Sequence, residues 1–475
     1  MLSGLVGFSI RFRDVVVALA CVVIAYGIYT AQKAKYDVYP EFAPPQVVVQ
    51  TEAPGLSSSD VEILVTRPVE YALNGAPGLS SIRSQSIQGL SVVTVVFEDK
   101  TDIYRARQMV GERLVEAAAQ MPQGVHNPAM APLIGATSLT LIVGLTSDHE
   151  SLMDLRTYAD WTMRPRLLGV PGVARISVFG GEVKQLQVQL LPDRMAAFHV
   201  SFNDVVTEAR NVTGVRGAGF VETGAERVVL ETEGQMLEPE KLANAVISTS
   251  NGHSVRLRDV ALTRAAAAPK FGDATIMGRP GVLILISGVY GANTVEVTRS
   301  IEAALGELKP SLQSAQIRLY PDLFRPANFI NAAVRNIGHS LLIGAALVSI
   351  ILLLFLFNLR VAFISLSAIP LSLLAAIIVL NAFGQSLNTL TLGGLAIAIG
   401  EVVDDAIIDA ENIFRRLREA PGDLNPAQLF QIVHDASIEV RSAVVYATFI
   451  VALVFVPVLT MSGVQGRLFA PLGWT

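Results

Sequence analysis

The chain has 475 residues; hydrophobic residues make up 51% and charged residues 16%, and the mean hydropathy is +0.49. This composition is too apolar for a soluble protein, so it indicates a membrane protein with a large water-facing part. The net charge of −5 gives no basic surface for nucleic acid, so we expect no nucleic acid partner. The single cysteine, Cys21, excludes an internal disulfide framework.

Five apolar runs are each long enough for the roughly 20 residues that cross the hydrocarbon core of a bilayer. We place the first span within residues 1–35 and the others at 336–358, 361–380, 389–413 and 441–461. In lipid each run must be helical, because only a helix satisfies its own backbone hydrogen bonds there. A cleaved signal peptide is the alternative for the first run, although Gln32 to Lys35 is a poor cleavage site.

Basic residues beside the spans predict the orientation, because they are more frequent on the cytoplasmic side. The basic residues used for this prediction are Arg11, Arg13, Arg360, Arg415, Arg416, Arg418 and Arg441. They predict a cytoplasmic N-terminus, a large extracytoplasmic block between the first and second spans, and a cytoplasmic loop at residues 414–440.

Strand-like and helix-like segments alternate in the extracytoplasmic block, and the pattern that starts near Gln46 recurs from Leu139. This weak repeat predicts ferredoxin-like β-α-β modules, so the expected fold is an α-helical transmembrane bundle with a large α+β extracytoplasmic insert. We assign residues 36–136 to the first module, 137–213 and 281–335 to the two parts of the second, and 214–280 to a docking-type insertion.

The fourth span carries five carboxylates in an otherwise apolar run. They are Glu401, Asp404, Asp405, Asp409 and Glu411. At 100° per residue they fall within an arc of about 160°. Each charge at the centre of a membrane helix costs on the order of 3 kcal/mol, so this face must point into a bundle or a watered cavity.

Mutually repelling carboxylates in such a place can exchange protons near neutral pH, which predicts a proton relay. For Asp409 and Glu411, ordinary ion pairs with Arg415 and Arg416 at the cytoplasmic end are an equally open interpretation. The apolar runs of the other four spans contain no lysine or arginine; they are Val15 to Ala31, Ile337 to Phe357, Val361 to Leu380 and Ser442 to Met461. We therefore expect the deeper acids to be protonated or to meet a cation outside this chain.

Other chemistries are less well supported. An intramembrane aspartyl protease places its two aspartates on different spans, whereas here all membrane acids lie on one. The six histidines show no ligand spacing. The methionines of the outer block are interpreted as core-filling residues rather than soft metal ligands, and they are Met121, Met130, Met153, Met163 and Met195.

Several segments together resemble a known family. Gly400 to Asn412, followed by Arg415 and Arg416, is similar to the fourth transmembrane helix of resistance-nodulation-division (RND) efflux pumps, with its intramembrane aspartate pair. Asp37 to Pro40 and Phe179 to Gln187 resemble the outer domain of the heavy-metal efflux branch. The resemblance covers essentially the whole chain, and its specificity comes from the combination of motifs.

This resemblance implies a homotrimeric inner-membrane antiporter that exchanges protons for a small cationic substrate, without enzymatic activity and without a cofactor. It also implies two partners, a periplasmic adaptor (membrane fusion protein) and an outer-membrane channel, and contact with membrane lipid. The outer modules would be pore-forming subdomains in the periplasm.

The sequence departs from the family in two respects. The family has twelve spans in two similar halves, and this chain resembles the first half, with residues 462–475 leading toward a sixth span. Neither a methionine at the place of Asp409 (copper and silver branch) nor an acid at the place of Ala398 (zinc, cobalt and cadmium branch) is present. The substrate metal and its ligands therefore stay unassigned, and a multidrug or lipid-exporting relative, or an inactive truncated fragment, are alternatives.

Overall fold

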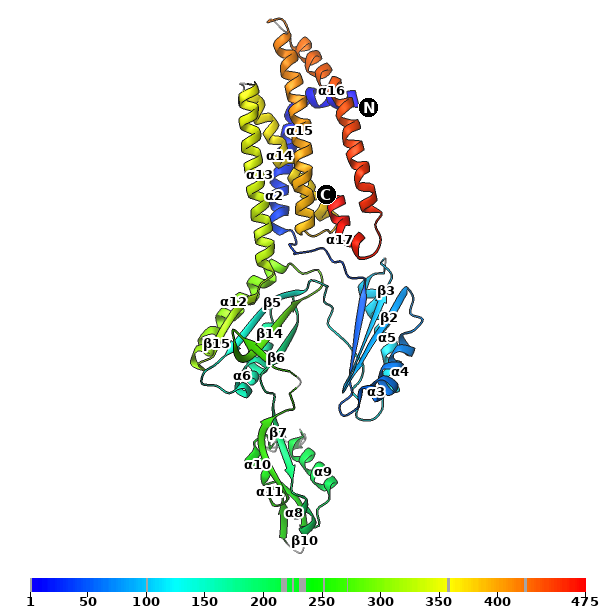
Figure 1. Ribbon diagram of the computed structural model, residues 1–475, viewed down its shortest axis with the longest axis vertical. Helices are drawn as coiled ribbons and strands as arrows, with labels where there is room; N and C mark the ends of the chain where they lie inside the picture. The colour runs from blue at the N-terminus through cyan, green and yellow to red at the C-terminus, as the bar shows by residue number, and fades with distance from the viewer. Residues whose placement is uncertain are drawn as a thin grey trace.

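The computed structural model describes residues 2–99, 101–214, 220–223, 226–229, 236–250, 253–270, 272–356, 359–422 and 425–475. Figure 1 shows three layers along the long axis of the molecule. A bundle of long helices occupies one end, two mixed α/β modules lie side by side in the middle, and a smaller α/β unit forms the far end.

Among the described residues, the bundle contains five long helices and two short ones. The long helices are α2 (Arg13–Lys33), α13 (Ala327–Leu356), α14 (Leu359–Ala382), α15 (Thr389–Glu419) and α16 (Pro426–Leu459). The short ones are α1 (Leu2–Arg11) and α17 (Gly463–Trp474). Within the described part of the chain, α2, α14 and α16 are long and apolar enough to cross a membrane.

Helices α2 and α14 approach each other closely at a glycine. A Cβ atom added to Gly27 would lie 2.6 Å from the Cβ atom of Leu374. Small residues permit such close approach of membrane helices. Gly27 therefore allows the first long helix to pack directly against α14.

The helices extend beyond the apolar runs that define the expected spans. Most of the expected loop at 414–440 is helical, because α15 continues to Glu419 and α16 begins at Pro426 after the capping residue Asn425. A hydropathy pattern identifies the apolar part of a helix. It does not show whether the helix continues into more polar, amphipathic turns. As a consequence, Arg441 belongs to the interior of α16 rather than to a loop.

The first outer module is one antiparallel sheet with helices, in the strand order β2-β3-β1-β4. Its strands are β1 (Gln46–Glu52), β2 (Leu79–Ile87), β3 (Leu90–Phe97) and β4 (Ala129–Met130). Between β1 and β2 the chain forms α3 (Ser58–Val61), the π-helical turn η1 (Glu62–Thr66) and α4 (Arg67–Leu73), and α5 (Ile103–Ala119) precedes β4. The alternating side chains of β1 and β3 and the apolar face of α5 form its core.

The second module repeats this arrangement around a second core. Its pairings run β6-β14-β5-β15, and β13 also pairs with β14. The strands are β5 (Leu139–Thr146), β6 (Val173–Gly180), β13 (Ala274–Ile276), β14 (Arg279–Gly288) and β15 (Arg318–Phe324). The helices are α6 (Leu152–Tyr158), η2 (Ala159–Met163), α7 (Arg164–Leu168) and α12 (Thr294–Ser314).

The far unit is inserted between β6 and β13, and it starts earlier than residue 214. Strand β7 (Lys184–Leu190) pairs with β12 (Ala261–Ala267), which closes the unit at both ends. Its other elements are α8 (Pro192–Ala197), α9 (Phe202–Thr213), β8 (Phe220–Glu222), β9 (Arg227–Val229), α10 (Pro239–Ala243), β10 (Val246–Ser250), β11 (His253–Arg256) and α11 (Leu257–Val260). The composition changes at Gly214, but the boundary is set by strand pairing and by a shared core that includes residues from 186 to 212.

The segment after α2 joins the start of α15 to the outer modules. The backbone N–H of Asp37 donates to the carbonyl of Leu387 at 3.1 Å, and the N–H of Leu387 donates to the carbonyl of Lys35 at 2.8 Å. The Thr389 hydroxyl, at the first residue of α15, donates to the carbonyl of Val38 at 2.7 Å. The start of the acidic helix is thus fixed to the chain that leads into the first module.

The Asp37 carboxylate extends this junction to the second module. Its Oδ1 accepts from the backbone N–H of Val38 at 2.7 Å and from the hydroxyl of Thr294, the first residue of α12, at 3.3 Å. Its Oδ2 accepts from the hydroxyl of Thr137, two residues before β5, at 3.4 Å. Burial raises the pKa of the Asp37 carboxyl above its ordinary value of 3.8, and these hydrogen bonds offset only part of the effect.

This arrangement predicts a pH-dependent difference between the protein and its Asp37→Asn variant. A carboxyl group with a raised pKa in the folded state stabilises most below its unfolded pKa, and that contribution is lost as the pH rises. An asparagine keeps the hydrogen-bonding positions but does not titrate. The melting temperature of Asp37→Asn relative to the parent should therefore increase between pH 4 and pH 7.

The control for this prediction is Thr294→Val, which removes one hydrogen bond to the charged carboxylate. Its melting temperature relative to the parent should decrease over the same pH range, because the charged form loses a partner. A difference between Asp37→Asn and the parent that is the same at both pH values would contradict the account of this junction.

Candidate functional site

Two of the acids of α15 line one cavity inside the bundle. Asp405 and Asp409 are four residues apart, so they lie one turn apart on the same face of α15. The cavity has a volume of about 510 Å³ and is lined by residues of α14, α15 and α16. Ser365 of α14 and Arg441 of α16 also line it.

Asp409 forms an ion pair with a residue that directly precedes the apolar run of the fifth span. Its Oδ2 accepts from a guanidinium nitrogen of Arg441 at 2.7 Å, and the two side chains are 24% and 34% exposed. The ion pair expected for Asp409 therefore exists, but with Arg441 and not with Arg415 or Arg416. It places a cation in the cavity that Asp405 also lines.

Asp405 lies one turn closer to the N-terminus of α15 than this ion pair. The hydroxyl of Thr448, on α16, donates to Asp405 Oδ2 at 3.4 Å. Asp405 and Asp409 thus both face α16, and the polar groups of α16 that meet them are Thr448 and Arg441. The lining of the cavity itself combines two carboxylates on α15, one cation on α16 and the hydroxyl group of Ser365 on α14.

The remaining acids of the predicted relay are placed differently. Glu411 is exposed on the surface of the described bundle. Glu401 and Asp404 lie on the helical backbone of α15, but their side chains lie outside the described residues. The site as described is therefore built on Asp405 and Asp409.

The last turns of α15 are hydrogen-bonded to α16 beyond the cavity. Asn412 is only 5% exposed, and its amide nitrogen donates to the carbonyl of Ala436 at 2.8 Å and to a carboxylate oxygen of Glu439 at 3.3 Å. Glu439 also pairs with Arg416 at 2.8 Å. These bonds hold the two helices together where they leave the apolar region.

Comparison with known proteins places the chain in a family. The family model for AcrB/AcrD/AcrF proteins matches residues 5–475. The chain belongs to the AcrB/AcrD/AcrF family. It is 33% identical to Protein HelA of Legionella pneumophila, 32% to the cobalt-zinc-cadmium resistance protein CzcA of Cupriavidus metallidurans and 31% to the cation efflux system protein CusA of Escherichia coli, in each case over 100% of this chain.

A crystal structure of a heavy metal efflux pump superposes on this AcrB/AcrD/AcrF family chain with a TM-score of 0.84 and 26% identity. The match covers 100% of this chain and 46% of that structure. The curated relatives are covered to 46%, 45% and 46% of their length, so the chain spans about half of each. The resemblance inferred from the acidic span and the outer segments is therefore confirmed at the level of the family and its heavy-metal relatives.

Two residues of the site in this family member were not found by sequence reasoning. Arg441 was missed because it precedes the apolar run of the fifth span, although it lies about four turns inside a continuous helix that begins at Pro426. Ser365 was missed because the third span contains three serines, and hydropathy does not show which of them faces the acids. To identify Ser365, one must know which face of α14 packs against α15, and only the three-dimensional structure shows this.

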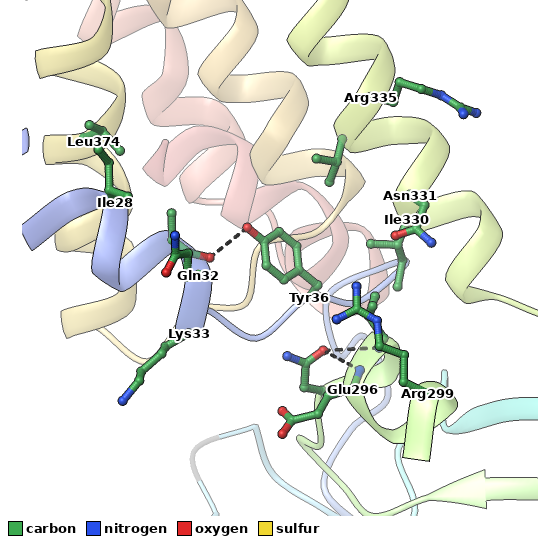
Figure 2. Close-up of a pocket in the computed structure, with 14 residues that line it drawn as sticks. Ile28, Gln32, Lys33, Tyr36, Glu296, Arg299, Ile330, Asn331, Arg335 and Leu374 are labelled. Carbon is green, nitrogen blue, oxygen red and sulfur yellow. Dashed lines mark hydrogen bonds between the residues drawn. The ribbon is translucent and has the colours of Figure 1, made fainter. Parts of the chain in front are cut away.

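A larger cavity of about 960 Å³ lies at the other end of the bundle, between α2, α12 and α13 (Figure 2). Lys33, Arg299 and Arg335 stand on its rim, and Ile28 and Leu374 form part of its apolar wall. Among the described lining residues, none is shared with the acidic cavity. The two are separate features of the bundle.

Metal ligands are not apparent in the described residues. Among them, no group of three or more histidine, cysteine, aspartate or glutamate side chains could hold a metal ion. Met163 is fully buried in the core of the second module, and Met121 and Met130 pack against that of the first. These methionines fill cores, as the sequence indicated.

The Asp409–Arg441 pair predicts a measurable coupling energy. A partly buried pair loses more when one partner is removed than an exposed pair does, because the other charge stays unpaired. A double-mutant cycle with Asp409→Asn and Arg441→Gln should give about 1 to 2 kcal/mol, from equilibrium unfolding in mixed detergents.

The matched control is the Glu439–Arg416 pair on the same two helices, whose side chains are 44% and 47% exposed. Its cycle should give less than about 1 kcal/mol. Equal coupling energies for the two pairs would show that the cavity does not shield Asp409 from water.

Proposed function

We propose that the chain is the N-terminal half of a proton-driven RND permease that exports a cation, a heavy metal, across the inner membrane. The observation that carries the proposal is the cavity that holds Asp405, Asp409 and Arg441 between three bundle helices of an AcrB/AcrD/AcrF family chain. The names of the relatives add support, since CzcA is a cobalt-zinc-cadmium resistance protein and CusA a cation efflux system protein.

The proposed mechanism uses the acids of α15 as the proton relay, with Asp404 and Asp405 as its centre and Asp409, Glu411 and Glu401 as further members. Carboxylates in an apolar bundle are stable when they are protonated or paired with a cation. Gain or loss of a proton changes the attraction between α15 and its neighbours. Because α15 begins at the junction with Asp37, a small movement of this helix would reach both outer modules.

The proposed architecture has five membrane spans, α2, α13, α14, α15 and α16, with two ferredoxin-like modules in the periplasm and the N-terminus in the cytoplasm. The parallel course of the five helices supports the spans (Figure 1), and the common strand order of the two modules supports the repeat. We further propose a homotrimer that works with a periplasmic adaptor and an outer-membrane channel. The inserted unit, at the end farthest from the bundle, would dock against them.

The orientation is tested with reporter fusions in the complete protein. A reporter that is active only in the periplasm should give a signal when it is inserted after Lys270, in the outer block. A reporter that is active only in the cytoplasm should give a signal when it is inserted after Gly422, between α15 and α16. A cytoplasmic signal at Lys270 would overturn the proposed topology.

The relay is tested by substitutions in the complete transporter. Asp404→Asn should abolish proton-driven export, and Asp405→Asn should reduce it by about 100-fold, the scale of a lost proton-transfer group. Asp409→Asn should reduce it only a few-fold, because Asp409 already forms an ion pair. Export is measured as cation release from loaded cells, with expression and assembly checked for each variant.

Glu419→Gln is the control, since Glu419 is an exposed acid at the end of the same helix. It should export at the parental rate. If Asp404→Asn and Asp405→Asn exported at the parental rate and still depended on the proton gradient, the relay would lie elsewhere, and Glu411 would be the next residue to replace.

A further inference from the structure

Two buried polar atoms in the acidic cavity have no hydrogen-bond partner among the described residues. One is the hydroxyl oxygen of Ser365, a side chain that is 1% exposed on α14. The other is Oδ1 of Asp409, the carboxylate oxygen that Arg441 does not bind. Both residues line the same cavity of about 510 Å³.

The other two serines of α14 show that the unpartnered state is specific to Ser365. The hydroxyl of Ser367 donates to the carbonyl of Ile364 at 2.6 Å, and that of Ser372 donates to the carbonyl of Ile369 at 3.1 Å. Serines in apolar helices generally satisfy themselves on a carbonyl of the preceding turn. The hydroxyl of Ser365 has no such carbonyl partner among the described residues, so its hydrogen bond has to come from outside its own helix.

Buried polar groups in folded proteins are satisfied by protein atoms or by ordered water. A water molecule occupies about 30 Å³ and needs two to four polar partners, so the cavity has room and partners for several. Its ionisable lining residues are Asp405 and Asp409 of α15 and Arg441 of α16, while α14 contributes Ser365. Because Arg441 is paired with Asp409 Oδ2, Oδ1 remains available to accept a hydrogen bond from water.

We propose that Ser365 anchors a chain of water molecules in this cavity that connects Asp409 with Asp405, so that protons move between the two acids through α14-bound water. This inference deepens the proposed function and rests on it. Ser365 is then a positioning residue: it holds the water that carries the proton and does not itself gain or lose one. The ligand of the cavity is water in its neutral and protonated forms.

The first test reads hydration directly and does not require transport. In the complete transporter with Cys21 and any other cysteine replaced, Ser365→Cys should react with a small water-soluble methanethiosulfonate reagent, because only a hydrated thiol ionises to the reactive thiolate. Ser367→Cys is the matched control, since two residues on a helix are about 200° apart and Ser367 lies on the opposite face. The rate at position 365 should be at least about 10-fold higher.

The second test reads proton delivery. Ser365→Ala should reduce proton-driven export a few-fold, as Asp409→Asn does, and enlarge its solvent deuterium isotope effect, because proton transfer then limits the cycle. Ser367→Ala should behave as the parent in both measurements. A merely structural role of Ser365 would lower the amount of folded protein and leave the isotope effect unchanged.

The outcomes are distinct. Fast labelling at 365 together with an enlarged isotope effect in Ser365→Ala supports the inference. Labelling of Ser365→Cys no faster than that of Ser367→Cys overturns it, and so does a Ser365→Ala transporter with parental rate and isotope effect. A parent protein that exports nothing counts against the proposed function instead, and the labelling result then decides the inference alone.

Discussion

The fold is organised around the need to keep the charges of α15 away from lipid. A carboxylate in the middle of an apolar helix is tolerated only where neighbouring helices or water surround it. The bundle meets this need by packing α14 and α16 around the acidic face and by bringing Arg441 to within 2.7 Å of Asp409.

The N-terminal end of α15 is connected directly to the outer block. Its first residues are hydrogen-bonded to the chain at 35–38, and Asp37 binds threonines at the start of α12 and just before β5. A proton-dependent change in α15 would therefore reach both modules through the hydrogen bonds of this junction. The junction relies on a half-buried carboxylate, whose raised pKa makes it more sensitive to pH than an exposed aspartate.

Sequence reasoning identified the family and predicted the acidic helix and a repeat of the outer modules, because these predictions depend on local sequence patterns. Five acids in an apolar run are unusual enough to predict a relay, and alternating strands and helices predict the repeat. It did not reach Arg441, Ser365 or the role of Asp37. Those contacts join residues more than 30 positions apart, and only the packing of helices and strands brings them together. The start of the inserted unit at β7 was missed for the same reason, since its partner β12 lies more than 70 residues away.

The central claim is that proton movement through the acids of α15 drives cation export. The most direct measurement follows both fluxes at once in vesicles that contain the complete transporter, with a pH-sensitive dye and a cation-sensitive dye inside. With an acidic lumen, cation uptake should be accompanied by proton loss from the lumen, and both should stop when an ionophore collapses the pH gradient. Cation uptake that continues at the same rate without the gradient would contradict the account.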